Sequence, residues 1–328
     1  MKPTVPRFVV FAPNWLGDTV MALPAIADVR RAIPQASLVI AARSAIAPLF
    51  TMVRGIDDVV VLGDKKRGWD SRHLFDMAIL LPNSFQSALT AWRAGVPARW
   101  GYRTDWRGPL LTRAIDPPSG VHQVEYYQRL VSALGFPNAH RPAQPHIALS
   151  KELLETGTRE LKGAGWDGRE PLVALAPGAA YGGAKRWPSA SFAELARALA
   201  DDGIQTVMVG GRGDLAVARA IEAELGGDVV LNLMATDLPT LAGILAACRA
   251  LVSNDSGAMH FAAALGVRVT AVFGPTDERV TRPAGDEHVV LTHPVWCRPC
   301  MMRECPIDHR CMRGIGVDRV VGAVRQML

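Results

Sequence analysis

Short apolar segments alternate with helical patterns along almost the whole of this chain. In the first half, helical patterns at 22–33 and 84–94 lie between apolar segments at 8–12, 37–41, 58–62 and 77–81. The second half repeats the scheme, with helical patterns at 191–200, 215–225 and 238–247 between apolar segments at 172–176, 205–210, 229–233, 249–252 and 267–273. This alternation is typical of βαβ units. The sequence therefore predicts two similar parallel sheets and a fold of the α/β class.

The length of the chain, 328 residues, exceeds the size at which one hydrophobic core usually stops growing. We therefore expect two domains, residues 1–150 and 151–328, each built on a doubly wound, Rossmann-like sheet. The boundary falls in a segment rich in proline and polar residues, 138–146, before a helical stretch at 151–163. Ligands of open parallel sheets gather at the carboxyl ends of the strands, so we expect both domains to face a central active cleft.

Charge and hydropathy narrow the functional classes. An apolar content of 49% with 20% charged residues is that of a globular protein, so disorder is not indicated. No apolar run approaches the roughly 20 residues that span a bilayer, and the run at 8–13 is interrupted too early for a signal peptide, so we expect a cytoplasmic protein. The formal charge of +5 suits a phosphorylated glycolipid or an anionic membrane surface, although surplus surface arginine explains it equally. We expect no nucleic-acid partner.

The stretch from residue 250 to residue 266 carries the clearest sign of a ligand site. An apolar strand ends in Ser253, Asn254 and Asp255, the chain turns through Ser256 and Gly257, and a helical pattern follows. The unpaired amide groups of such a helix point at the turn, and phosphate is their usual occupant. The alternative is structural, because asparagine, aspartate and serine are also the usual residues that cap a helix.

Two further strand ends have a similar design. The strand at 172–176 leads into a glycine-rich loop with Lys185 at its far side, and such a loop can approach a pyrophosphate closely and neutralise it. Near the start of the chain, the strand at 8–12 feeds a glycine turn that carries a carboxylate, Asp18, and then a helix. Together the three strand ends indicate a site for a phosphorylated ligand.

In this order and at this spacing, the three segments resemble the family of glycosyltransferases that contains the lipopolysaccharide heptosyltransferases. The resemblance runs along nearly the whole chain, and its shared elements are residues 16–18, 177–178 with 185–188, 253–257 with 259–260, and 273–277. The cysteine-rich tail, 297–311, is similar to that of the subgroup called heptosyltransferase II, which adds the second heptose of the inner core.

The resemblance implies the GT-B architecture, with a first domain for the acceptor, a second for the nucleotide sugar, and a last helix, 317–328, that crosses back to the first domain. It implies an inverting transfer of L-glycero-D-manno-heptose from ADP-heptose to the first heptose of heptosyl-Kdo2-lipid A, peripherally at the cytoplasmic face of the inner membrane. Alternatives are heptosyltransferase I or III, another sugar transferase of this fold, a nucleotide-sugar epimerase, and a non-catalytic nucleotide-binding scaffold.

Two side chains are the candidate catalytic residues. Transfer from a nucleotide sugar needs a base for the acceptor hydroxyl and positive charge for the departing diphosphate. The resemblance assigns the base to Asp18, whose alternative role is that of a helix N-cap. It assigns the cation to Lys185, whose alternative is a solvated surface lysine.

The remaining candidate residues surround the nucleotide sugar. Ser256 and Gly257 offer backbone amides to the phosphates, whereas the resemblance assigns Asp255, which would repel them, to the sugar hydroxyls or to orienting the turn. His260, one turn further along the helix, is a candidate for phosphate or sugar, and its alternative is a helix histidine with a structural hydrogen bond. The resemblance places the adenosine near Ala180, Tyr181, Asp214 and Thr236.

The metal-binding prospects are of two kinds. The sequence has no Asp-x-Asp motif in which a divalent metal would bridge a diphosphate, so we expect catalysis that requires no cofactor. Four cysteines close to His309 are a candidate structural metal or iron–sulfur site, namely Cys297, Cys300, Cys305 and Cys311. Reduced thiols and disulfides remain open, although a reducing cytosol disfavours disulfides. Such a site would brace a loop rather than perform the chemistry.

Basic and aromatic residues cluster twice in the first half, at 65–69 and at 99–103, with Trp106 and Arg107 just beyond. If the first domain receives the acceptor, these clusters are where the phosphates of a lipid A core or a membrane surface would dock. The alternative is a solvated basic face.

Overall fold

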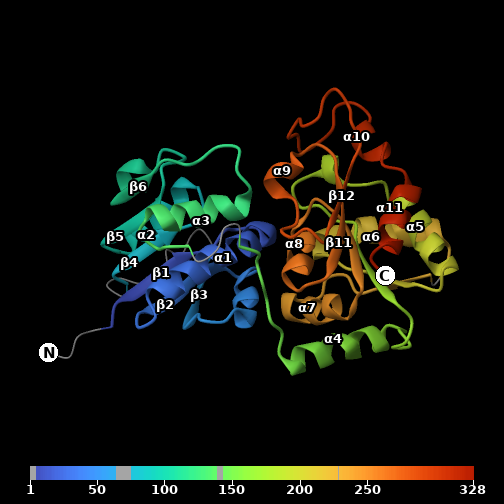
Figure 1. Ribbon diagram of the computed structural model, residues 1–328, viewed down its shortest axis with the longest axis horizontal. Coiled ribbons are helices and arrows are strands. Elements are labelled where there is room, and N and C mark those ends of the chain that lie inside the picture. The colour runs from blue at the N-terminus through green and yellow to red at the C-terminus, as the bar shows by residue number, and fades with distance from the viewer. Residues whose placement is uncertain (1–4, 64–74, 139–142, 228) are drawn as a thin grey trace. The chain divides into compact units, whose positions relative to one another are not determined.

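The computed structural model describes residues 5–63, 75–138, 143–227 and 229–328. The chain divides into two compact units, Met1–Pro145 and His146–Leu328, shown in Figure 1. The division lies within the segment 138–146, which is rich in proline and polar residues. Among the described residues, no helix is both long enough and apolar enough to cross a membrane.

The first unit is built on a six-stranded parallel sheet with the strand order β3-β2-β1-β4-β5-β6. Its strands are β1 (Arg7–Phe11), β2 (Ser37–Arg43), β3 (Asp58–Leu62), β4 (Met77–Leu80), β5 (Ala98–Tyr102) and β6 (Arg113–Ile115). The order runs outward in both directions from β1, which pairs with β2 on one side and β4 on the other. That is the doubly wound order of Rossmann folds, in which ligands bind where the winding reverses.

The second unit repeats this topology. Its strands are β7 (Leu172–Ala176), β8 (Gln205–Met208), β9 (Val230–Asn232), β10 (Ala250–Asn254), β11 (Arg268–Phe273) and β12 (Val289–Thr292). Their order is β12-β11-β10-β7-β8-β9, so β7 takes the place that β1 has in the first sheet. The prediction of two Rossmann-like, doubly wound parallel sheets is confirmed.

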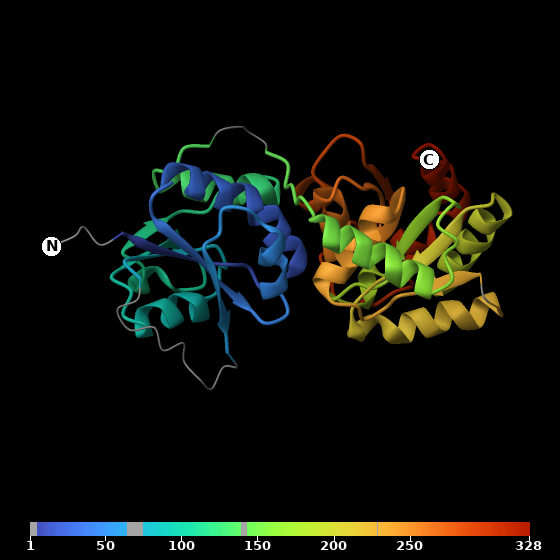
Figure 2. The same cartoon turned by 90° about the horizontal axis from the view of Figure 1, so that it is seen from below.

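Three α-helices flank the sheet of the first unit in its described part. They are α1 (Leu16–Ala32), α2 (Phe85–Arg93) and α3 (Gln123–Ala133), and short 3-10 helices lie at Ala47–Met52 and Gly108–Leu110. Alternate residues of β1 face opposite sides: Val9 and Phe11 belong to the core that α2 covers. Figures 1 and 2 show α1 and α3 side by side on the other face.

The first helix begins earlier than the sequence suggested. We expected a turn over residues 16–18 and a helix from residue 22, but α1 begins at Leu16, so Asp18 is its third residue. The N-cap residue, Trp15, makes no side-chain capping hydrogen bond. The helix continues through Pro24, although proline usually disrupts a helix interior because it lacks an N–H. Asp18 therefore occupies the first turn of a helix, where the macrodipole stabilises a negative charge.

The second unit has helices on both faces of its sheet. They are α4 (Lys151–Gly163), α5 (Ser189–Asp201), α6 (Leu215–Leu225), α7 (Leu238–Ala247), α8 (Gly257–Ala264), α9 (Glu278–Thr281), α10 (Arg310–Arg313) and α11 (Val317–Arg325), with 3-10 helices at Gly183–Lys185 and Arg212–Asp214. Helices α5, α6 and α11 share one apolar core with the sheet. On the other face α8 packs against β10 and β11, α7 against α8, and α4 against α7.

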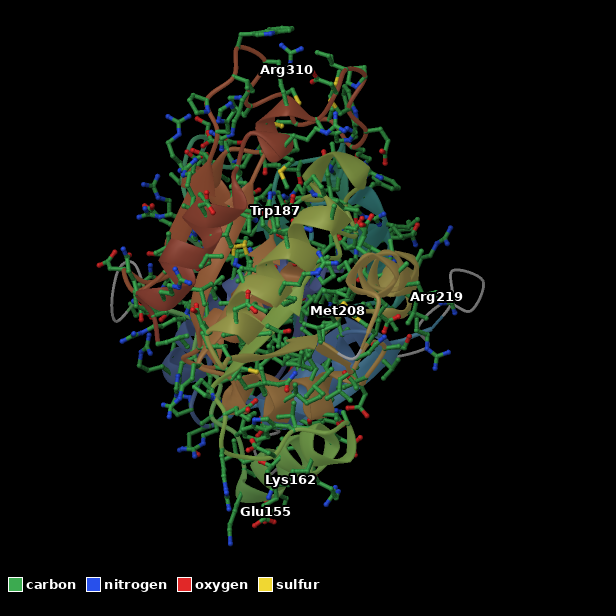
Figure 3. All side chains as sticks on the ribbon, turned by 90° about the vertical axis from the view of Figure 1, so that its right-hand side faces the viewer. Glu155, Lys162, Trp187, Met208, Arg219 and Arg310 are labelled. Atoms are coloured by element: carbon green, nitrogen blue, oxygen red, sulfur yellow. The ribbon has the colours of Figure 1, made fainter. Side chains whose placement is uncertain are left out.

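Trp187 anchors the core beneath α5, α6 and α11. It is 1% exposed, its indole N–H donates to the carbonyl of Ile315 at 3.0 Å, and its ring meets Phe192 edge to face. Figure 3 shows Trp187 and Met208 inside this layer, while Arg219 points outward from α6. Helix α11, which we expected to cross back to the first domain, buries Val320 and Val324 in this core of the second unit.

Candidate functional site

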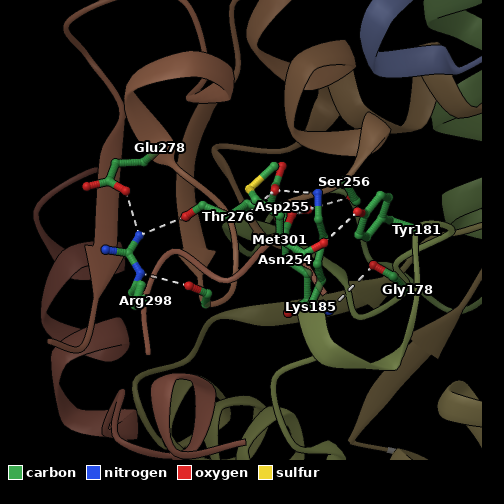
Figure 4. A network of polar contacts seen from close by, with 12 residues as sticks. Gly178, Tyr181, Lys185, Asn254, Asp255, Ser256, Thr276, Glu278, Arg298 and Met301 are labelled. Carbon is green, nitrogen blue, oxygen red and sulfur yellow. Dashed lines mark hydrogen bonds and ion pairs between the residues drawn. The ribbon is translucent and has the colours of Figure 1, made fainter. Parts of the chain in front are cut away.

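The candidate donor site lies at the carboxyl edge of the second sheet. Strand β10 pairs with β7 on one side and with β11 on the other, so the loops that follow these three strands meet. The loop after β7 carries Tyr181 and Lys185, the turn after β10 carries Asp255, and the turn after β11 carries Thr276. Figure 4 shows these side chains converging from the three strand ends.

Lys185 and Asp255 form a largely buried ion pair at the centre of this edge. The Lys185 Nζ lies 2.5 Å from Asp255 Oδ2, and the side chains are 12% and 5% exposed. The hydroxyl of Thr276 donates to the same carboxylate oxygen at 2.6 Å. The alternative of a solvated surface lysine is therefore wrong for Lys185, whose charge is held at a fixed point beside Asp255.

Tyr181 completes the surroundings of the lysine. The Lys185 Nζ lies 4.7 Å from the centroid of the Tyr181 ring, within the range of a cation–π contact. The Tyr181 hydroxyl donates to the carbonyl of Met301 at 2.8 Å, which fixes the ring against the loop that follows β12. The aromatic ring and the carboxylate of Asp255 together orient the ammonium group.

Asn254 ties the glycine-rich loop to the strand beside it. Its side chain is fully buried, accepts from the backbone N–H of Trp187 at 3.0 Å, and donates to the carbonyl of Pro177 at 2.7 Å. Asn254 is thus hydrogen-bonded to both ends of the glycine-rich loop, at Pro177 and at Trp187. From sequence we considered only capping for Asn254. The structure gives no support to capping, since the N-cap of α8 is Ser256 and it makes no side-chain capping bond.

Arg298 is a second residue that the sequence did not reveal as part of this edge. Its guanidinium donates to the carbonyls of Gly274 at 2.7 Å and Thr276 at 3.1 Å, and to the Glu278 carboxylate at 2.5 Å. These bonds hold the turn that presents Thr276 to Asp255. Arg298 stands between two cysteines in a segment without periodicity, so the only signal was its position in the tail.

The predicted adenosine residues lie at the ends of β7, β8 and β9, along the same edge. Asp214 lies close against Gly178, where an added Cβ would come within 2.1 Å of its carboxyl carbon. The backbone N–H of Gly211 donates to Asp214 Oδ2 at 3.1 Å. Thr236 is half-buried, and Ala180 is exposed. The geometry gathers these positions, and their contact with adenosine stays a prediction.

Helix α8 supplies the other predicted phosphate contacts. Ser256 is its N-cap and Gly257 its first residue, so the amide groups of its first turn lack helical carbonyl partners. The hydroxyl of Ser256 lies 3.1 Å from that of Ser253, which is buried. His260 is 5% exposed on the same helix. The roles of Ser256, Gly257 and His260 remain predictions.

Asp18 belongs to the first unit. It is half-buried in the first turn of α1, with no side-chain cap from Trp15 before it. Burial raises the pKa of the Tyr127 hydroxyl well above its ordinary value, and the negative charge of Asp18 raises it further. Tyr127 on α3 therefore stays protonated beside the carboxylate at neutral pH.

The four cysteines of the tail are free thiols. Cys300 is exposed and Cys311 is buried, while Cys305 accepts a hydrogen bond from the backbone N–H of His309 at 3.3 Å. Burial, and then the neighbouring thiols Cys297, Cys305 and Cys300, raise the pKa of Cys311. In the described ranges, no three histidine, cysteine or acidic side chains are placed to hold a metal ion. As they stand, these side chains do not fit the candidate metal site.

The predicted basic docking surface of the first unit is only partly available. The guanidinium of Arg99 donates to the carbonyls of Leu110 and Val96, and that of Arg107 is fully buried beside the carbonyl of Tyr102. Burial lowers the pKa of Arg107 to about 10. Trp106, by contrast, is 93% exposed. The cluster at 65–69 lies outside the described residues.

Fold and comparisons together define the class of the protein: it is a glycosyltransferase with a GT-B-like fold of two Rossmann-type sheets. The family model described as glycosyltransferase family 9 (heptosyltransferase) matches residues 71–310. The chain therefore belongs to glycosyltransferase family 9, and the family that the sequence resembles is confirmed.

Individual relatives agree with this assignment. Lipopolysaccharide heptosyltransferase 2 of Salmonella typhimurium is 31% identical over 304 residues, which cover 87% of each chain. The structure of E. coli ADP-heptose LPS heptosyltransferase II has 27% identity and a TM-score of 0.84, covering 98% of both chains. An E. coli heptosyltransferase solved with ADP-2-deoxy-2-fluoro heptose shares the fold, with a TM-score of 0.71, 21% identity, and coverage of 98% and 99%. The chain is thus similar to heptosyltransferases of the lipopolysaccharide core.

Proposed function

We propose that the chain transfers L-glycero-D-manno-heptose from ADP-heptose to the first heptose of heptosyl-Kdo2-lipid A, with inversion at the sugar carbon. The supporting observation is the buried pair between Lys185, on the glycine-rich loop, and Asp255. The chain that carries it is 31% and 30% identical to two relatives named lipopolysaccharide heptosyltransferase 2. ADP-heptose enters the proposal because a relative of the same fold was solved with a fluorinated form of it.

The second unit binds the donor in this proposal. Lys185 faces the diphosphate, assisted by the amide groups of Ser256 and Gly257 at the start of α8. Oδ2 of Asp255 is held by Lys185 and Thr276, and its other carboxylate oxygen accepts hydrogen bonds from hydroxyls of the sugar. The adenosine lies along the ends of β7, β8 and β9, beside Ala180, Tyr181, Asp214 and Thr236, and His260 faces the phosphate or the sugar.

The first unit supplies the base. The acceptor hydroxyl oxygen attacks the anomeric carbon, its proton passes to the carboxylate of Asp18, and the bond to the ADP oxygen breaks with its electrons on the leaving group. Lys185 stabilises the charge that builds on the diphosphate. In this proposal the step needs no metal ion or other cofactor. The enzyme works at the cytoplasmic face of the inner membrane, where its lipid acceptor lies.

The test measures ADP release and product mass with ADP-heptose and either heptosyl-Kdo2-lipid A or Kdo2-lipid A as acceptor. We expect turnover on the heptosylated acceptor only, and a loss of roughly two to four orders of magnitude in Asp18→Asn. Asp58→Asn, which changes an exposed carboxylate in the same unit, is the control and keeps full activity. Turnover on Kdo2-lipid A would instead assign addition of the first heptose, and conversion of ADP-heptose without acceptor would assign an epimerase.

A further inference from the structure

The tail loop, defined as residues 294–309, lies directly on the donor loop between β7 and α5. Three backbone atoms of the donor side take part: the N–H of Ala184 donates to the Arg303 carbonyl at 2.9 Å, the N–H of Gly183 donates to Glu304 Oε1 at 2.9 Å, and the Pro275 carbonyl accepts from the N–H of Met301 at 2.9 Å. The tail loop is therefore held in one register against the candidate diphosphate site.

Two adjacent glycines make this close approach possible. A Cβ on Gly182 would lie 2.2 Å from the Arg303 carbonyl oxygen, and one on Gly183 would lie 2.5 Å from Glu304 Oε2. At Gly182 the atom met is backbone and cannot move aside, whereas at Gly183 the Glu304 carboxylate would have to leave its hydrogen bond with the loop. Arg303 thus contacts the donor loop through its backbone, and its side chain takes no part in this contact.

That side chain extends over Tyr181. The Cζ of Arg303 lies 5.2 Å from the ring centroid, and the Nζ of Lys185 lies 4.7 Å from the same centroid. In the described part of the chain, no ion pair within 4 Å involves Arg303, and the residue is exposed. A guanidinium that rests on a ring keeps its N–H donors at its edges, where they suit phosphate oxygens.

The balance of charge at the candidate diphosphate site favours a second cation beside Lys185. The charge of Lys185 is already matched by Asp255, and Glu304 adds a second carboxylate next to the donor loop. A diphosphate carries more than one negative charge, so one partly neutralised ammonium leaves most of that charge uncompensated. Arg303 shares the ring of Tyr181 with Lys185 and has no carboxylate partner among the ion pairs of the described residues.

We propose that Arg303 is a second diphosphate-binding cation, delivered to the donor loop by the tail loop. The inference rests on the proposed donor, a nucleoside diphosphate sugar, and adds a residue that binds it. Tyr181 then acts as a platform that spaces the two cations, and the hydroxyl bond to Met301 keeps this platform attached to the loop that carries Arg303.

The test is calorimetric titration of the full chain with ADP and with adenosine. We expect Arg303→Gln to weaken ADP binding by about 10-fold or more, as for the loss of a charged hydrogen bond, and to leave adenosine binding within about twofold. Arg219→Gln, which changes an exposed arginine on α6, is the matched control and alters neither affinity. Equal loss for both ligands, or no loss for ADP, would overturn the inference.

Lys185→Gln separates this inference from the proposed function. Suppose that the wild type binds ADP, that Lys185→Gln weakens ADP binding, and that Arg303→Gln does not. The proposed donor site is then supported and the role of Arg303 is refuted. If wild type binds no ADP, the proposed donor fails, and the inference fails with it. Arg303→Lys should recover part of the ADP affinity, because it restores the charge without the planar donor edge.

Discussion

The Nζ of Lys185 lies 2.5 Å from Oδ2 of Asp255, although the two residues are 70 positions apart in the chain. Strand pairing explains the contact, because β7 and β10 are neighbours and both residues follow the carboxyl ends of these strands. Lys185 and Asp255 belong to separate sequence motifs, but in the structure they form one ion pair.

Breaking this pair from either side should destabilise the second unit. Lys185→Met leaves a carboxylate that is 5% exposed without its counter-ion, and removing one partner of a buried pair costs about 3–5 kcal/mol. Asp255→Asn should cost less, because the ammonium left unpaired is more exposed than the carboxylate and keeps its contact with the Tyr181 ring. The double variant should be more stable than the sum of the single changes implies. Urea unfolding of the four proteins gives the coupling, and additive effects would mean that the pair is not energetically coupled.

Arg298 should matter for the donor site although it touches no catalytic residue. Arg298→Met removes three hydrogen bonds, including those to the carbonyls of Gly274 and Thr276, and leaves Glu278 unpaired. We expect a loss of about 1–3 kcal/mol in unfolding free energy and a higher KM for the nucleotide sugar, because Thr276 no longer supports Asp255. The matched control, Arg310→Met, breaks only a surface pair with Asp308 and should change neither quantity. An unchanged KM in Arg298→Met would show that the turn at 274–276 keeps its conformation without Arg298.

The contact between helices α4 and α7 depends on two glycines. A Cβ on Gly157 would lie 2.0 Å from the carbonyl carbon of Gly243, so the backbones touch directly. Gly157→Ala should push the helices apart and lower the unfolding free energy by about 1–3 kcal/mol, the usual cost of overpacking. Gly163→Ala in the same helix meets no atom within 4 Å and should be neutral or slightly stabilising. Thermal unfolding compares the two, and equal midpoints would refute the steric argument.

Sequence patterns identified the two sheets because their central strands are short apolar runs between helices. The predicted strand at 172–176 coincides with β7, and 205–210 contains β8. The patterns missed β6 and β12, which are edge strands of three and four residues and mostly half-buried, so they lack a clear apolar run. We did not predict strand β5, because we interpreted its arginine and tryptophan as part of a basic docking surface.

The residues of the candidate site likewise fall into those that the sequence indicated and those that it did not. Lys185 and Asp255 could be named as candidates from sequence because they follow the ends of apolar strands, and the family resemblance added Tyr181. Arg298 and Arg303 could not, because their contacts join residues that are 20 to 122 positions apart in the chain and no local pattern encodes such pairing. Only the three-dimensional path of the tail loop brings them to the donor loop.

His288 should make the stability of the second unit depend on pH. Its Nδ1 accepts from the backbone N–H of Val269 at 3.2 Å, and its Nε2 lies 3.2 Å from the carbonyl of Ala284, so the neutral form with a proton on Nε2 fits both partners. Burial lowers the pKa of His288 below its ordinary value, while Glu287, 3.5 Å away, opposes this only partly.

Because the folded state binds a proton at this ring less readily than the unfolded state, stability is fully present above about pH 6.5 and is lost as pH falls through the lowered pKa. Urea unfolding at pH 7.5 and at pH 5 should show this loss in the wild type. In His288→Gln the loss should be smaller, since glutamine does not titrate. Glu287→Gln should steepen the loss, because removing the carboxylate lowers the pKa of the folded state further. An identical pH dependence in wild type and His288→Gln would assign the acid sensitivity to other groups.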